Sequence, residues 1–182
     1  MKMRTIRKKL KRKLHMTSGF SLGEMLLAVA LLSLAGVMIA GGITVAIRAY
    51  RDMTRKENAE TLYSTVTDRL RTEFRSASGV KPVDGTVVFK SSSKTALDGK
   101  MIAFKENTEN GHILVHYYTA SYQDTGSSDE LFPDATYTDG LKVEFDSPIT
   151  AADHLITYSI KVVSEDGKII AGKDDGKQSI AY

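Results

Sequence analysis

The sequence predicts an α+β fold, in which one long N-terminal helix packs on a small antiparallel β-sheet. Three observations predict it: an uncharged run over residues 25–47, an amphipathic helical pattern that continues after this run, and short alternating segments with turn residues after residue 80. A helix followed by consecutive hairpin strands is an α+β arrangement. At 182 residues the chain has room for one small domain and an appendage.

The charge of the chain is segregated along its length. Eight of its 25 lysine and arginine residues lie in residues 1–19, which hold no acid, so the remainder is acidic. A basic body that wraps nucleic acid is therefore not expected. The absence of cysteine excludes a disulfide framework, thiol catalysis and cysteine-ligated metal sites.

The uncharged run predicts a membrane-spanning helix. Its 23 residues, Met25 to Ile47, would rise about 35 Å as a helix, slightly more than a hydrocarbon core of about 30 Å. A helix that is apolar on every side is difficult to bury in a soluble protein of this size. The basic residues upstream predict that the N-terminus is cytoplasmic and that the globular domain is extracytoplasmic.

Three processing routes begin with such a segment. A secretory signal peptide would be cut after the apolar run, near Gly42 or Ile43, whereas a signal anchor would not be cut. A third class is cut before the apolar run. The residues at that junction, Ser18 to Leu27, favour the third class and have the sequence SGFSLGEMLL.

This junction resembles the type IV prepilin signature, which has a glycine, an aromatic residue, a short apolar run and a glutamate at the fifth position after the cut. Gly19, Phe20 and Glu24 stand at these positions, and the resemblance is close over residues 13–47. It implies that a prepilin peptidase removes the basic leader, residues 1–19, by cutting between Gly19 and Phe20. It also implies that the new amino group of Phe20 is methylated.

Two residues depart from the family pattern. Ser18 stands where many relatives have lysine or arginine, and Gly23 replaces a bulky aliphatic residue just before the glutamate. Neither change removes a group that the processing chemistry needs. Gly23 lowers the local helix propensity.

The resemblance gives Glu24 a role in assembly. A carboxylate at the edge of a lipid-embedded helix is costly and is by default functional. Its partner would be the α-amino group of Phe20 on a neighbouring subunit, and this one ion pair would select the register between apolar helices. In the other interpretation, Glu24 only reaches the headgroups from the first helical turn, where the helix dipole favours an acid.

Small residues within the apolar run predict close packing between helices. Gly36 and Ala40 form one pair spaced four apart, and Gly42 and Ala46 form another. The adjacent glycines Gly41 and Gly42 also predict a point where the helix can bend or partly unwind.

The helical period continues beyond the apolar run. Apolar residues recur at spacings of three and four and form a stripe: Ala59, Leu62, Tyr63, Val66, Leu70, Phe74 and Ala77. Charged residues between them predict a solvated face: Arg55, Lys56, Glu57, Glu60, Asp68, Arg69, Arg71, Glu73 and Arg75. We expect one helix from about Leu22 to Ser78, stopped by Gly79. Residues 20–47 would be its transmembrane and assembly half, and residues 48–79 its amphipathic half.

Residues 80–182 are expected to form an antiparallel β domain. The strand-like segments are Thr86–Lys90, Met101–Lys105, His112–Tyr118, Leu141–Phe145 and Leu155–Val163. The turn Glu165–Lys168 leads into Ile169 and Ile170 as a hairpin. Residues 120–140 are polar and dotted with aromatics, which predicts a functional or mobile loop. Residues 172–182 are expected to form a turn or a frayed tail.

No catalytic constellation is apparent in the sequence, so neither an enzyme nor a cofactor is expected. His112 and His116 share one face of a predicted strand but lack a third ligand at a suggestive spacing, so no metal site is expected either. Ser91 to Ser93 are expected to form a loop rather than to supply a nucleophile. The sequence has no phosphate-binding glycine motif and no nucleophile elbow.

The resemblance therefore implies a structural subunit, a pilin or pseudopilin, of a type IV pilus-type filament or of a secretion or DNA-uptake pseudopilus. The implied partners are other pilin subunits, the prepilin peptidase and methyltransferase, an assembly ATPase and a platform protein. The chain would be a single-pass membrane protein before assembly and part of a cell-surface filament afterwards. The alternative is an uncleaved, signal-anchored extracellular binding domain that does not polymerise.

Overall fold

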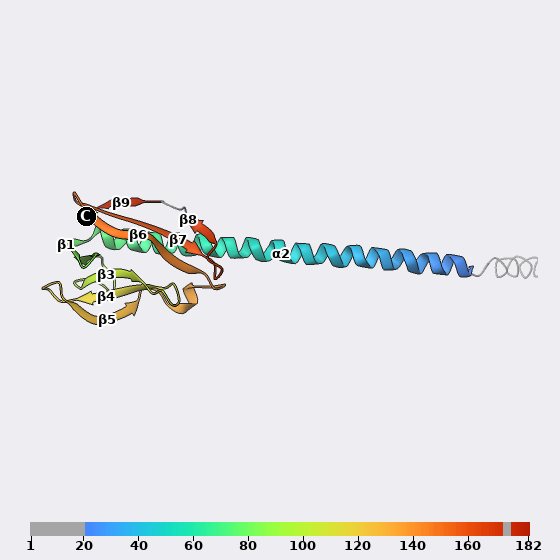
Figure 1. Cartoon of the computed structure of the whole chain (residues 1–182), viewed down its shortest axis with the longest axis horizontal. Helices are drawn as coiled ribbons and strands as arrows, with labels where there is room; N and C mark the ends of the chain where they lie inside the picture. The colour runs from blue at the N-terminus through green and yellow to red at the C-terminus, as the bar shows by residue number, and fades with distance from the viewer. Residues whose placement is uncertain (1–20, 173–175) are drawn as a thin grey trace, which may run out of the picture. The chain divides into compact units, whose positions relative to one another are not determined.

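A computed structural model describes residues 21–172 and 176–182 and confirms the α+β fold. One long helix, α2 (Leu22–Arg75), is followed by strands β1 to β9 (Figure 1). The chain divides into two compact units at Tyr50, and α2 contributes to both. The basic leader, the expected cut site and Phe20 lie outside the described residues.

The strands form two antiparallel sheets rather than the single sheet expected. The five-stranded sheet has the order β1 (Ser78–Val83), β2 (Thr86–Lys90), β3 (Met101–Glu106), β4 (Ile113–Tyr118) and β5 (Asp124–Glu130). The four-stranded sheet consists of β6 (Lys142–Ala152), β7 (Leu155–Val163), β8 (Ile169–Gly172) and β9 (Gln178–Ala181). In the latter, β7 pairs with each of the other three strands.

The predicted stripe of α2 joins both sheets in one hydrophobic core. Ala59, Leu62, Val66, Leu70, Phe74 and Ala77 are all buried, and Tyr63 packs partly buried against them. The ring of Phe74 lies 5.5 Å from that of Phe89 on β2 and 5.2 Å from that of Tyr158 on β7. One aromatic side chain of the helix therefore contacts both sheets.

The first half of α2 has no such cover. Every residue from 21 to 53 is exposed, and large apolar side chains such as Leu22, Leu32 and Val37 are more than 70% accessible. This helix contains a segment that is long and apolar enough to cross a membrane. Because burying apolar surface is favourable, a lipid bilayer or neighbouring apolar helices would stabilise this half.

The helix ends at Arg75, three residues before the expected end. Ser76 closes the last turn by donating its hydroxyl to the carbonyl oxygen of Thr72 at 3.0 Å. Gly79, expected to stop the helix, lies within β1 with a φ of +59°. Its carbonyl accepts a 2.8 Å hydrogen bond from the hydroxyl of Tyr122. The early end lets the chain turn directly into β1.

The prediction of a loop over residues 120–140 was wrong in part, because residues 124–130 form β5. This strand, DTGSSDE, lies at the edge of the five-stranded sheet with every residue exposed. A strand with both faces in solvent needs no alternation of apolar and polar residues, so its sequence carries no strand signal. A short 3₁₀ helix, η1 (Asp134–Thr136), follows it.

The prediction of a frayed tail over residues 172–182 was also wrong at its end. Strand β9 pairs with β7, with Ile180 opposite Ile156. Gln178 ties β9 to the core, because it accepts a 3.1 Å hydrogen bond from the hydroxyl of Tyr158 and donates one of the same length to that of Tyr63. Only one side chain of this strand, Ile180, is both apolar and large, which explains why the sequence did not reveal it.

Candidate functional site

The start of α2 is organised by Ser21 and Glu24. The backbone N–H of Ser21 donates a 2.9 Å hydrogen bond to the carboxylate of Glu24, and the backbone N–H of Glu24 donates a 3.2 Å bond to the hydroxyl of Ser21. This reciprocal pattern is a capping box, in which the two side chains satisfy two backbone donors of the helix start. Its Ser-x-x-Glu signature is present in the sequence, but the sequence reasoning missed it.

The capping box leaves Glu24 able to take a further partner. The bond from Ser21 reaches the Oε2 atom, and no hydrogen bond to Oε1 occurs within residues 21–172 and 176–182. The carboxylate is exposed in the isolated chain. Capping and an intermolecular ion pair are therefore compatible. The pair with Phe20 stays a prediction, because Phe20 lies outside the described residues.

The small residues of the apolar half present an open surface. A Cβ atom added at Gly36, Gly41 or Gly42 would meet nothing within 4 Å. The helix continues through these positions without interruption. The hydroxyl of Thr44 donates to the carbonyl of Ala40 at 3.0 Å, which satisfies that side chain within the helix. The surface permits close approach of a second helix, and both the packing role and the flexible point stay predictions.

The solvated face predicted for the second half of α2 has one exception, Glu73. Its side chain is fully buried, against expectation. Its carboxylate accepts hydrogen bonds from the hydroxyls of Ser91 and Ser93, both at 2.6 Å, and from that of Thr95 at 2.9 Å. The guanidinium of Arg69 lies 3.2 Å away, on the preceding turn of the helix. Buried charges occur when such partners are present, so this site is structural: it fastens the loop after β2 to the helix.

The two histidines, which the sequence placed on one strand face, have different neighbours in the structure. His112 precedes β4, whereas His116 lies within it. The Nδ1 atom of His112 lies 2.9 Å from the carboxylate of Glu130 and 3.5 Å from that of Asp134. Its ring stacks on Tyr137, with centroids 3.8 Å apart.

The structure thus supplies the additional donors that sequence spacing did not suggest. One imidazole nitrogen and two carboxylates converge within 4.8 Å, a donor set that could hold a divalent cation. In the structure these groups satisfy one another: the hydrogen bond from His112 is the main cause that holds the pKa of Glu130 below its ordinary value. The cluster fastens the segment after β5 to the start of β4.

The fold defines the class of the molecule: a long, apolar N-terminal helix packed on antiparallel β-structure, an arrangement like that of type IV pilins. Comparisons of the chain with family models, with curated proteins and with solved structures gave no match. Any assignment beyond this class therefore depends on the chemistry of the chain itself.

Proposed function

We propose that this chain is a structural subunit, a pilin or pseudopilin, of a type IV pilus-type filament or of a secretion or DNA-uptake pseudopilus. The peptidase would cut between Gly19 and Phe20, and the mature subunit would assemble through its N-terminal helix. The observation that carries the proposal is the exposed apolar half of α2, whose first turn contains the capping-box residue Glu24.

The apolar half of α2 would lie in two environments in succession, first lipid and then the filament. Before assembly, the lipid bilayer would cover it, with the basic leader on the cytoplasmic side. After assembly, the apolar helices of neighbouring subunits would take the place of lipid. Small residues such as Gly36 and Ala40 would let these helices approach closely.

Glu24 would fix the register between the helices of neighbouring subunits in the assembled state. Apolar helices slide past one another with little preference, whereas one ion pair in an apolar environment is strongly position-dependent. The methylated amine of Phe20 keeps its positive charge and would pair with Glu24 of the neighbouring subunit. The ion pair would join the chain to other pilin subunits, and the resemblance to type IV prepilins implies the other partners: a peptidase with methyltransferase activity, an assembly ATPase and a platform protein.

A Gly19→Val variant tests the processing step. A peptidase must approach the backbone closely at the cut, and glycine has no side chain in the way. We expect the variant to accumulate in the membrane as the full-length precursor, detected by its mass, while Ser18→Ala, the adjacent control, is processed. Normal processing of Gly19→Val would contradict the proposed cut site.

The wild-type chain in the same experiment separates the alternatives. An intact N-terminus would support the signal-anchored binding domain that does not polymerise. A mature chain that begins near Gly42 or Ile43 would support a secreted protein cut after the apolar run.

A further inference from the structure

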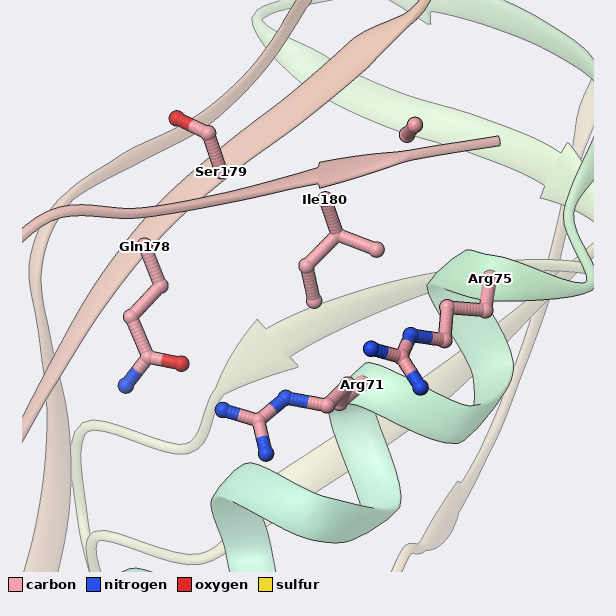
Figure 2. Close-up of a pocket in the computed structure, with 6 residues that line it drawn as sticks. Arg71, Arg75, Gln178, Ser179 and Ile180 are labelled. Atoms are coloured by element: carbon pink, nitrogen blue, oxygen red, sulfur yellow. The ribbon is translucent and has the colours of Figure 1, made fainter.

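Two arginines near the end of α2 line a cleft beneath the last strand. Arg71 and Arg75 stand one helical turn apart, and with β9 they border a cleft of about 520 Å³. Both guanidinium groups extend into the space between α2 and β9, and the side chains of Gln178 and Ile180 descend toward the helix from the strand (Figure 2).

Among the described residues, the positive charge of this cleft is balanced only in part. Arg71 forms an ion pair with Asp68 at 3.3 Å, and that carboxylate is largely exposed to solvent. Within residues 21–172 and 176–182, no carboxylate forms an ion pair with Arg75. Like charges four residues apart on a helix repel each other. An anion in the cleft would relieve this repulsion.

The strand that borders the cleft has a free backbone edge. Strand β9 pairs with β7 and, in the described part of the chain, with no other strand. The N–H of Tyr182 donates to the carbonyl of His154 on the β7 side. Because backbone groups alternate in direction along a strand, those of Ser179 and Ala181 point away from β7. Both residues line the cleft, so free donors and acceptors lie beside the two guanidiniums.

These features together fit an extended acidic segment that adds a strand to β9. The backbone of such a segment would pair with the free edge, and its carboxylates would meet the guanidiniums. The chain itself contains such a segment. Residues 120–140 hold five acids and no lysine or arginine, and within them β5 is an exposed edge strand.

We propose that the acidic edge strand β5 of one copy docks in the Arg71–Arg75 cleft of a second copy, beside β9. The inference rests on the proposed filament function and names one contact between its globular domains. Because β5 and β9 are different surfaces on different sheets, the contact is heterologous. Repetition of a heterologous contact that does not close into a ring generates an open filament.

Acidic side chains are exposed on both faces of β5, Asp129 on the face of Tyr117 and Asp124 on the face of Lys105, so one of them can face the guanidiniums. The side chains of Asp124 and Asp129 belong to exposed residues of the strand. Asp129 accepts a 2.8 Å hydrogen bond from Tyr117, and Asp124 lies 4.0 Å from Lys105, a distance that leaves room for a closer cation. Arginine is suited to this role, since its planar guanidinium binds a carboxylate through two parallel hydrogen bonds.

Charge reversal tests the contact in cells that express the full chain. We expect the double variant Arg71→Glu, Arg75→Glu to be processed and inserted normally, with filament yield reduced at least tenfold. A matched reversal at Lys90 and Lys94, two exposed lysines elsewhere on the same domain, is expected to leave the filaments unchanged. If the double variant unfolds, Arg75→Glu alone replaces it, because Arg75 is exposed.

A charge swap then separates a contact between copies from a role within one copy. The variant Asp124→Lys, Asp129→Lys is also expected to lose filaments when expressed alone. Co-expressed with the arginine-reversed copy, it places lysines of one copy against glutamates of the next, and mixed filaments are expected to return. Thermal melting of each variant establishes that both copies are folded.

The outcomes distinguish this contact from the function on which it rests. Normal filaments from the arginine-reversed variant, or no restoration by two folded co-expressed copies, would overturn the β5–cleft contact while leaving a pilin function intact. Absence of filaments from the wild-type chain would instead overturn the proposed function, and the contact with it. Restored mixed filaments would establish the contact.

Discussion

The carboxylate of Glu73 on α2 accepts a 2.6 Å hydrogen bond from the hydroxyl of Ser91, and both side chains are fully buried. The bond joins the helix to the loop that follows β2. It is the centre of a polar cluster inside an otherwise apolar contact between the helix and the five-stranded sheet. The hydrogen bonds to the Glu73 carboxylate therefore hold the domain to its helix, in addition to the contacts of the apolar stripe.

Removal of this carboxylate is expected to destabilise the domain. Glu73→Ala would leave Ser91, Ser93 and Arg69 without their common acceptor, at a cost of about 3 kcal/mol in the free energy of unfolding. Unfolding of the detergent-solubilised full chain, followed by tyrosine circular dichroism, measures this loss. The control is Glu60→Ala, on the exposed face of the same helix. Equal stability of the two variants would contradict the role of the cluster.

The capping box allows the proposed assembly role of Glu24 to be separated from its structural role. Ser21→Ala removes one half of the box and is expected to destabilise the helix start by about 1 kcal/mol, with filaments retained. Glu24→Val is expected to leave insertion and cleavage intact and to abolish assembly. Electron microscopy of strains that produce each variant distinguishes the two roles. Equal loss of filaments in both would mean that Glu24 acts only as a cap. Normal filaments from Glu24→Val would contradict the proposed ion pair.

Stability at alkaline pH is expected to depend on Tyr158. Burial is the main cause that raises the pKa of this phenol to about 12, against an ordinary value of 10.0. A raised pKa means that the folded state favours the neutral phenol. Its contribution is therefore complete below pH 10 and is lost as the pH rises through 12.

A Tyr158→Phe variant tests this dependence. It is expected to lose about 1 kcal/mol at neutral pH, because the hydrogen bond to Gln178 is absent, and to lose less additional stability between pH 10 and pH 12. Thermal melting across this range measures both effects. Tyr50→Phe, at an exposed position, is the control. An alkaline profile unchanged by Tyr158→Phe would contradict the assignment.

Acid is expected to loosen the segment after β5. The hydrogen bond from His112 lowers the pKa of Glu130 below its ordinary value of 4.5. A lowered carboxyl pKa gives stability above pH 4.5 that is lost as the pH falls through the folded-state value. The protection of the amides of residues 131–141 against hydrogen exchange, relative to their intrinsic rates, should fall below pH 4.5. In Glu130→Gln this protection should already be low at pH 7, while Glu109→Gln, at an exposed position nearby, should resemble the wild type.

The sequence predicted what depends on periodic burial and missed what depends on contacts between distant segments. The spacing of Val66, Leu70 and Phe74 predicted the core face of α2, because a helix buries one side. The burial of Glu73 could not be predicted this way, since its hydroxyl partners lie about twenty positions further along the chain. The capping box was accessible, because Ser21 and Glu24 form a local signature.

The strands also divide into those that the sequence predicted from periodic burial and those that it missed. Strand β7 was predicted at its observed bounds, because Ile156, Tyr158 and Ile160 face the core in alternation. Strands β5 and β9 were missed, since each lies at an edge and has few or no apolar side chains to bury. The convergence of Glu130 and Asp134 on His112 depends on β5, so it could not be predicted without that strand.

The most direct test of the account is the N-terminal sequence and mass of the protein recovered from cells that produce it naturally. We expect a mature chain that begins FSLGEM, with Phe20 carrying a methyl group on its amine. A protein that still begins MKMRTI would contradict the account, because no free amine at Phe20 would then exist to pair with Glu24 of another subunit.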